Sequence, residues 1–217
     1  MLKLFKLAHN AEIAEIGYYP QVEVSWPWSI DYWGERSFVN TPLSGSVRDD
    51  VVFPKFNLAS RAKANDWVGN GAALEINYLF ISDRLYELMR SFQMDEYQQF
   101  PVSVEAQGNT LDYHLVYFLW PRSDDYIDWQ NTIFQRTTGS GETNFEQFKN
   151  TRERQFAKNK YELSIHQSVI HAEKITCDVF RFNGYGLGFY VSERLKNAME
   201  AAGMTGIVYE VPEWLPR

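Results

Sequence analysis

The same phrase stands twice in this chain, and it constrains the fold more than any other feature of the sequence. FISDRLYELM runs from Phe80 to Met89, and YVSERLKNAM runs from Tyr190 to Met199. Each copy begins with strand-forming residues, continues through a serine and an acid, and ends in apolar residues at helical spacing. At a constant offset of 110, the identical pairs are Ser82/Ser192, Arg84/Arg194, Leu85/Leu195, Met89/Met199 and Met94/Met204.

Both copies have the residues that a corner from strand to helix requires. Ser82 and Ser192 stand where a helix N-cap belongs, because a serine hydroxyl can accept a hydrogen bond from an unpaired backbone N–H. The acid after each serine lies in the first turn, where negative charge meets the positive end of the helix dipole. We therefore predict two related strand–helix–strand units, near residues 76–105 and 186–211. Duplication and convergence both remain open as their origin.

Each predicted helix has an arginine in its first turn, at the unfavourable end of the dipole. The presence of Arg84 and Arg194 in both copies predicts that each has a partner, either an acid or a carbonyl of a neighbouring strand. A structural tether is the main interpretation. The alternative is a small-ligand-binding protein or an enzyme, with an anion pocket between the two units lined by Arg84, Arg194, His114 and tyrosines.

The remaining segments mix strand and helix patterns without a regular βαβ alternation. Leu111–Trp120 is nearly continuous apolar and aromatic, which is typical of a central strand covered on both faces. Residues 58–68 suggest a short helix, 137–144 a flexible loop, and 145–163 a helix packed through a phenylalanine stripe.

These patterns predict an α+β fold with a mixed or antiparallel sheet and packed helices. We expect a single domain over residues 1–217, in which a β- and loop-rich N-terminal part covers 1–60 and an α+β core covers 61–217. The aromatic stretch WPWSIDYW in the N-terminal part has no clear role.

Charge and cysteine content limit the class of protein. The formal net charge of −7 argues against a nucleic-acid binder, which normally carries a basic stripe. A single cysteine, Cys177, allows no internal disulfide and suits a reducing compartment. No apolar run is long enough to span a membrane, and the first residues lack the apolar core of a signal peptide. We expect a cytoplasmic protein, and self-association remains open.

The sequence contains no pattern that indicates catalysis, a cofactor or a metal. A nucleophile elbow, a P-loop and an HExxH motif are all absent. His166 and His171 are five residues apart, which is poor spacing for two ligands of one metal ion on a strand or a helix. HAEK at 171–174 lacks the paired cysteines of a zinc deaminase, since Cys177 stands alone.

SDDYIDW, residues 123–129, is the best candidate for a partner-binding surface. Three acids are interleaved with two aromatics, and aromatic anchors beside acids suit docking on a basic protein. A solvated loop explains the acids equally well, but it explains the aromatics less well. The candidate contact residues are Asp124, Asp125, Tyr126, Asp128 and Trp129.

Several short motifs occur in a familiar order: FPKFNLASRAKANDWV, the first SDRL helix start, QFPVSVE, DYHLVYF, IDWQNTIF and the second copy of the repeat. Over roughly residues 52–213 the chain resembles a family of bacterial immunity proteins from polymorphic toxin systems, of the myxobacterial type with S-x-R-L helix starts. The family was formerly a domain of unknown function. The residues that match its motifs are Lys63, Asp66, Trp67, Ser82, Leu85, Asp128 and Phe134.

The resemblance implies a cytoplasmic protein that protects the producing cell by binding a cognate toxin, made beside it. It supplies no catalytic residue to carry over, in agreement with the lack of a reactive motif. We therefore predict a non-enzymatic, toxin-binding protein without cofactor, metal, nucleic-acid or membrane partner.

Overall fold

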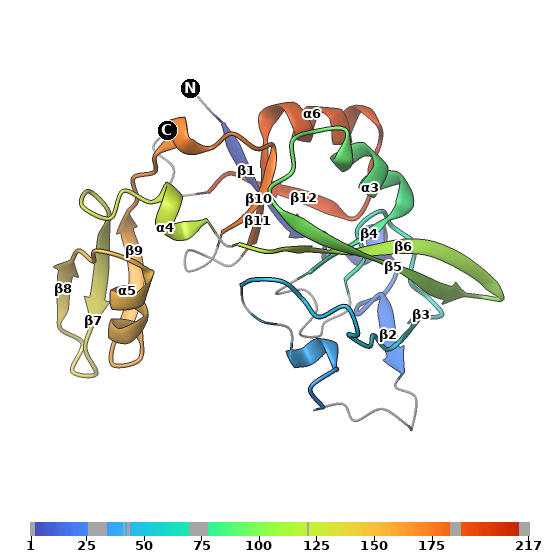
Figure 1. Cartoon of the computed structure of the whole chain (residues 1–217), viewed down its shortest axis with the longest axis horizontal. Helices are drawn as coiled ribbons and strands as arrows, with labels where there is room; N and C mark the ends of the chain where they lie inside the picture. Colours follow the sequence, from blue (N-terminus) through green and yellow to red (C-terminus); the bar gives the residue numbers. More distant parts are fainter. Residues whose placement is uncertain are drawn as a thin grey trace.

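The computed structural model describes residues 3–25, 34–40, 42, 44–69, 78–120, 122–182 and 188–212. The WPWSIDYW stretch lies outside the described residues. Among these residues, three sheets and five α-helices make up an α+β fold, as predicted from the sequence (Figure 1). No helix among the described residues is long and apolar enough to cross a membrane.

The largest sheet contains the first predicted unit. Its strand order is β2-β3-β5-β6-β4, and β4 leads into helix α3 before the chain returns through β5. Both β4 and β5 run antiparallel to β6, which lies between them. The elements are β2 (Val22–Ser25), β3 (Lys55–Leu58), β4 (Tyr78–Ser82), α3 (Asp83–Arg90), β5 (Tyr97–Ala106) and β6 (Asn109–Phe118).

The second sheet repeats this arrangement with a strand from the start of the chain. In the order β10-β11-β1-β12, strand β11 leads into helix α6, and the chain returns through β12. Both β11 and β12 run antiparallel to β1, which lies between them as β6 does in the first unit. The elements are β1 (Leu4–His9), β10 (Val179–Phe182), β11 (Gly188–Ser192), α6 (Glu193–Ala201) and β12 (Ile207–Glu210).

The two units therefore share one architecture, in which a strand–helix–strand segment is split by an antiparallel strand from elsewhere. In the first unit the inserted strand β6 follows directly, through a hairpin that turns at Gln107 and Gly108. In the second unit the inserted strand is β1, nearly the whole chain away. The N-terminal part predicted over residues 1–60 thus supplies the centre of the C-terminal sheet.

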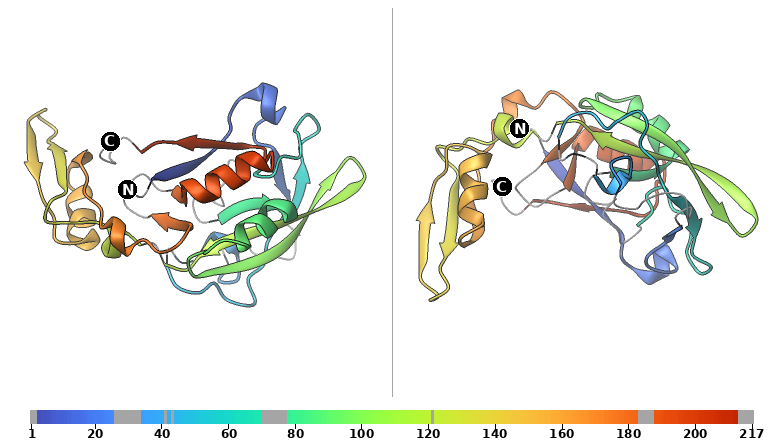
Figure 2. Two further views of the ribbon diagram at one scale, coloured as in Figure 1. Left: turned by 90° about the horizontal axis from the view of Figure 1, so that it is seen from above. Right: turned by 60° about the horizontal axis from the view of Figure 1, so that its bottom comes forward.

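Helices α3 and α6 lie side by side and close one shared hydrophobic core between the two sheets (Figure 2). Alternation along each strand sends every second side chain into this core. Leu79 and Ile81 of β4 face it, as do Phe189 and Val191 of β11. The residues between them face outer clusters, with Phe80 behind the large sheet and Tyr190 behind the second sheet.

A third sheet, order β8-β7-β9, stands to one side of this body with helix α5 packed on it (Figure 1). We call residues 133–167 the side lobe. Phe134 of β7 faces the helix and reaches the outer cluster of the second sheet. The elements are β7 (Ile133–Thr137), β8 (Thr143–Glu146), α5 (Thr151–Lys158) and β9 (Glu162–Gln167).

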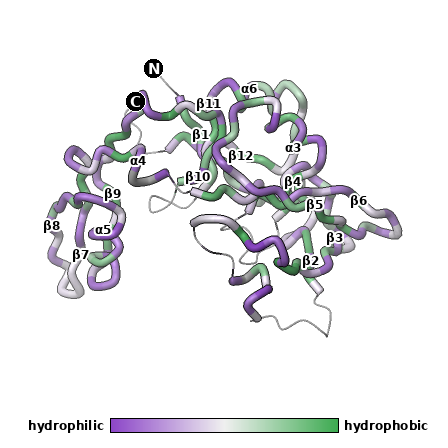
Figure 3. The backbone as a smooth tube through the Cα atoms, in the orientation of Figure 1, coloured by the Kyte–Doolittle hydropathy of each residue, from purple (hydrophilic) through white to green (hydrophobic). Residues whose placement is uncertain are grey.

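The remaining helical elements in the described part of the chain are short. They are α1 (Ile13–Ile16), α4 (Ser123–Tyr126) and the 3-10 turns η1 (Phe38–Asn40) and η2 (Ala172–Lys174). Figure 3 shows hydrophobic residues along strands of the two central sheets, whereas the residues of α5 are largely hydrophilic.

The loop predicted over residues 137–144 corresponds to the turn of the β7–β8 hairpin, which covers residues 138–142. Two other local predictions are wrong. Residues 58–68 form no helix, because other segments take their backbone donors: Ala59 N–H donates to Gln21 O and Lys63 N–H to Ile16 O. Helix α5 covers only the middle of 145–163.

The predicted phenylalanine stripe is wrong as well. Phe145 lies on β8 and is 59% exposed, and Phe156 on α5 is 64% exposed. Only Phe148, between the two elements, packs against Phe134. The helix is held on its sheet by Arg154, whose guanidinium lies over the Phe134 ring.

Candidate partner-binding site

The first copy of the repeat forms a corner around a buried aspartate. Ser82 caps α3 by accepting a hydrogen bond from Leu85 N–H, and its own hydroxyl donates to Asp66 Oδ1 at 2.7 Å. Arg84 donates to both carboxylate oxygens, from Nε at 3.2 Å and from Nη2 at 2.7 Å. The backbone joins in, because Ser82 N–H donates to Asp66 O.

The second copy forms the same corner around Asp178. Ser192 caps α6 through Leu195 N–H and donates to Asp178 Oδ1 at 2.7 Å. Arg194 again donates from Nε and Nη2 to the two carboxylate oxygens, and Ser192 N–H donates to Asp178 O. The partner expected for each arginine is therefore an acid. We call these two arrangements the aspartate corners.

Each aspartate corner also binds the segment that follows the helix of the other unit. Thr205, after α6, donates its backbone N–H and its hydroxyl to Asp66 Oδ2. Gln93, after α3, donates its backbone N–H to Asp178 Oδ2 at 3.1 Å. Arg84 Nη2 additionally donates to Gly203 O. The carboxylate of each corner thus binds the backbone of the other unit, and the two units are held together by both corners.

The electrostatics of the corners favour the ionised carboxylates. Burial raises the pKa of Asp66, but hydrogen bonds from Arg84, Ser82 and Thr205 outweigh it and leave the pKa below its ordinary value of 3.8. Asp178 behaves alike: burial raises its pKa, and hydrogen bonds from Arg194, Ser192 and Gln93 lower it further than burial raises it.

The other motif residues have packing or tethering positions. Trp67, Leu85 and Leu195 are buried in the shared core. Lys63 donates from Nζ to Ala14 O at 2.6 Å, which ties its loop to the first helical turn. None of the three apolar residues is available to a partner in this structure.

In the described part of the chain, the side chains expected to line the alternative anion pocket do not come together. Arg84 and Arg194 are bound in separate corners, each on its own carboxylate. His114 is 9% exposed, stacks on Tyr86 and binds Gln99 through Nδ1 and Asp83 through Nε2. Because all three side chains are engaged in bonds within the fold, they do not converge on a shared ligand position.

The segment Ser123–Trp129, which we call the acidic segment, places its acids and its aromatics differently. Asp125 is exposed, and Asp128 caps the following turn by accepting hydrogen bonds from Gln130 and Asn131. The side chain of Asp124 lies outside the described part. Tyr126 and Trp129 are 6% and 8% exposed. A contact role for the segment stays a prediction. Asp125 is exposed on its surface, whereas Tyr126 and Trp129 are not.

The aromatics are buried because the segment closes the outer cluster of the second sheet. Tyr126 meets Phe180 edge to face, with ring centroids 5.3 Å apart. Trp129 stacks on Phe134 at 6.2 Å. The Trp129 Nε1–H finds no hydrogen-bond acceptor among the described residues. These rings therefore join the side lobe to the body of the protein.

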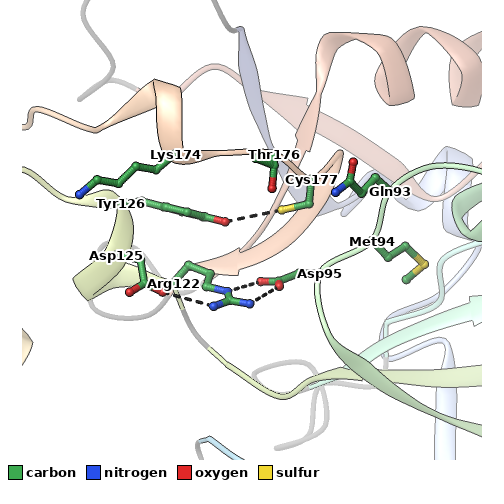
Figure 4. Close-up of a pocket in the computed structure, with 9 residues that line it drawn as sticks. All are labelled: Gln93, Met94, Asp95, Arg122, Asp125, Tyr126, Lys174, Thr176 and Cys177. Carbon is green, nitrogen blue, oxygen red and sulfur yellow. Dashed lines mark hydrogen bonds and ion pairs between the residues drawn. The ribbon is translucent and has the colours of Figure 1, made fainter.

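A cavity of about 310 Å³ opens beside the acidic segment (Figure 4). Arg122 spans it, donating to both oxygens of Asp95 at 2.7 and 2.6 Å and reaching Asp125 Oδ2 at 3.3 Å. The buried Asp95 carboxylate is thus satisfied, whereas Asp125 faces solvent at the mouth. The other lining residues are Gln93, Met94, Tyr126, Lys174, Thr176 and Cys177.

The cavity offers polar recognition rather than an activated nucleophile. Burial raises the pKa of the Cys177 thiol, so the thiolate is disfavoured. Burial also raises the pKa of Tyr126, whose hydroxyl lies 3.7 Å from the sulfur. Among the described residues, no three His, Cys, Asp or Glu side chains gather as metal ligands would.

Sequence reasoning did not single out Asp178, Asp95 or Arg122. One signal was present for Asp178, since an aspartate precedes each capping serine, by 16 residues at Asp66 and by 14 at Asp178. No comparable signal joins Asp95 to Arg122, because the two residues meet only through the packing of the second sheet.

The comparison with protein families gives a match over most of the chain. The model described as "Immunity protein family (Imm11)" matches residues 6–212 of the 217. The matched region includes both aspartate corners, the acidic segment and the side lobe. This confirms the resemblance to an immunity protein family. A search of curated proteins finds no match.

The first aspartate corner predicts an acid-sensitive contribution to stability. Because the folded-state pKa of Asp66 is lowered, its contribution is present above about pH 4 and is lost as the pH falls through the folded-state pKa. Asp66→Asn should lower the free energy of unfolding by about 2 kcal/mol at pH 7, since it weakens several charge-assisted hydrogen bonds. Urea unfolding from pH 7 to pH 3 should show this difference shrinking toward acid.

Asp112→Asn provides the control for this comparison, because Asp112 is exposed and forms no ion pair in the described part of the chain. Its unfolding curves should follow the wild type throughout the pH series. A constant gap between Asp66→Asn and wild type from neutral to acid would contradict the role assigned to the carboxylate.

Burial of Trp129 predicts that its removal damages the fold itself. Trp129→Ala should cost about 3–5 kcal/mol of stability, as large-to-small changes of buried aromatics do. Trp129→Phe keeps a ring on Phe134 and removes the N–H that lacks an acceptor, so its cost should stay below about 1.5 kcal/mol. Equal losses in thermal or urea unfolding would show that ring packing is not what Trp129 supplies.

Proposed function

We propose that this protein, which belongs to the Imm11 immunity protein family, protects its cell by binding a cognate toxin and covering the toxin's active surface. The family match over residues 6–212 carries the proposal. In this role the protein acts in the cytoplasm and catalyses no reaction of its own. It binds a toxin whose gene lies next to its own.

The reactive side chains of the described part support a binding role over a catalytic one. The arginines of the repeat and His114 are bound within the fold, and the pKa of the Cys177 thiol is raised by burial. A tight complex requires an interface of about 1,200–2,000 Å², formed by about 20–30 residues on each side. The cavity beside Arg122 is lined by only nine residues. The toxin would therefore cover the cavity together with the surface around it.

The acidic segment is the first surface we assign to this contact. Asp125 is 59% exposed, stands at the mouth of the cavity and is held by Arg122 at 3.3 Å. A basic side chain of the toxin can approach Asp125 while Asp95 continues to neutralise Arg122. An acidic patch meeting a basic one speeds association and excludes partners of the wrong charge.

Co-expression tests the function directly. Cells that carry the adjacent toxin gene should survive when this protein is made and should stop growing when it is absent. Purified protein and catalytically inactivated toxin should elute together on size exclusion. Growth arrest despite abundant soluble protein would reject the immunity role.

Charge reversal at the acidic segment tests the surface. Asp125→Lys should weaken the affinity for the inactivated toxin at least about tenfold, or about 1.4 kcal/mol, chiefly through slower association at low salt. Asp112→Lys makes the same change of charge on the β5–β6 hairpin and should bind as the wild type does. If both variants weaken binding equally, the effect comes from net charge and the acidic segment is not the contact.

A further inference from the structure

The outer surface of α5 carries an apolar cavity that its own chain leaves open. Phe156 is 64% exposed on a helix whose single buried side chain is Arg154. A hollow of about 430 Å³ lies between Phe156 and Phe148, with Arg152, Glu153 and Ala157 completing its wall. A large aromatic exposed beside a hollow is typical of a contact surface rather than of a solvated helix face.

Basic side chains flank this hollow. Arg152 lines it, and the Lys160 ammonium lies 4.3 Å from the centroid of the Phe156 ring. Lys149, Arg152 and Lys160 are exposed and form no ion pair with the described residues. The one acid of the wall, Glu153, is occupied in accepting the Lys149 backbone N–H at the start of the helix.

The charge of the side lobe is opposite to that of the rest of the chain. Residues 133–167 contain six basic and four acidic residues, whereas the remainder contains fifteen basic and twenty-four acidic ones. The lobe thus has a formal charge of +2 against −9 elsewhere. A nucleic acid would be repelled by the larger acidic body, so a protein surface fits this small basic patch better.

We propose that the α5 surface, formed by Phe148, Arg152, Phe156 and Lys160, is a second docking site, which binds an acidic region of the toxin. An apolar side chain of that region fills the hollow between the two phenylalanines, and its neighbouring carboxylates meet Arg152 and Lys160. The inference rests on the proposed function. It adds a contact of opposite polarity to that of the acidic segment.

Two contacts of opposite charge would give the complex one orientation. Figure 1 shows the side lobe standing away from the body, with α4 close to the point where the lobe begins. A toxin that meets Asp125 with a basic patch and α5 with an acidic patch cannot turn around without placing like charges together. Such a pairing raises specificity more than affinity.

The side lobe contains its own matched control. Phe145 is 59% exposed and belongs to the same lobe, but it lies on the opposite face of the sheet from α5. Cross-strand pairing shows this, because Phe134 under the helix pairs with Glu146, so Phe145 points the other way. Phe145→Ala and Phe156→Ala therefore remove the same exposed ring from two faces of one small unit.

The experiment measures binding of purified variants to the catalytically inactivated toxin encoded beside this gene, by surface plasmon resonance at two salt concentrations. Phe156→Ala should weaken the affinity at least tenfold through faster dissociation, with unchanged thermal stability. Arg152→Glu with Lys160→Glu should slow association and reduce its salt dependence. Phe145→Ala should bind within twofold of the wild type.

The outcomes separate this inference from the immunity role. Wild-type affinity in Phe156→Ala, with the toxin still neutralised, would overturn the α5 site and leave the proposed function intact. Equal losses in both phenylalanine variants would overturn it as well. A dimer of the free protein that Phe156→Ala abolishes would assign the surface to a second copy instead. Failure of the wild type to bind toxin would reject the proposed function itself.

Discussion

The two aspartate corners keep carboxylates ionised at positions where burial alone would disfavour the charge. The rest of the fold depends on the hydrogen bonds that make this possible. Asp66 is buried, yet it receives five hydrogen bonds from Ser82, Arg84 and Thr205. A carboxylate satisfied in this way is stable only if every donor is in place. Strand, helix start and the loop from the other unit must therefore assemble together, which gives the fold one mutual orientation of its units.

The shared core follows from the corners. Because each corner fixes the direction in which its helix leaves the sheet, α3 and α6 are set side by side over the apolar faces of β4 and β11. Met89 and Met199, which the repeat also has in common, meet in this core and are fully buried. The repeated phrase is thus architectural, and the surfaces that we propose for toxin contact, the acidic segment and α5, lie outside it.

The parts of this fold that sequence could predict are those decided by local chemistry. Capping serines, first-turn acids and the helical spacing after them were sufficient to place α3 and α6. Their carboxylate partners could not be placed, because Asp66 stands in a loop that resembles a helix and Asp178 precedes an unrelated strand. Strand β1 was missed for the same reason: its partners, β11 and β12, come from the other end of the chain.

The candidate site shows the same limit. The structure exposes Asp125 of the acidic segment, but it buries the aromatic residues Tyr126 and Trp129 in the outer cluster of the second sheet. An amphipathic ring can serve a core or a contact, and only tertiary packing decides between them. The opposite holds for Phe156: its sequence spacing predicts that it packs against the sheet, but its ring is exposed to solvent.

The central position of β1 has a consequence for how the protein is made. Leu4 pairs with Ser192 and Lys6 with Glu210, so β1 leaves the ribosome long before either neighbouring strand exists. Contacts of such sequence separation form slowly, and an unpaired strand is prone to aggregation meanwhile. The second sheet can close only after synthesis of β12. Any activity that needs the second sheet is therefore available only from chains synthesised through β12, about two hundred residues after β1.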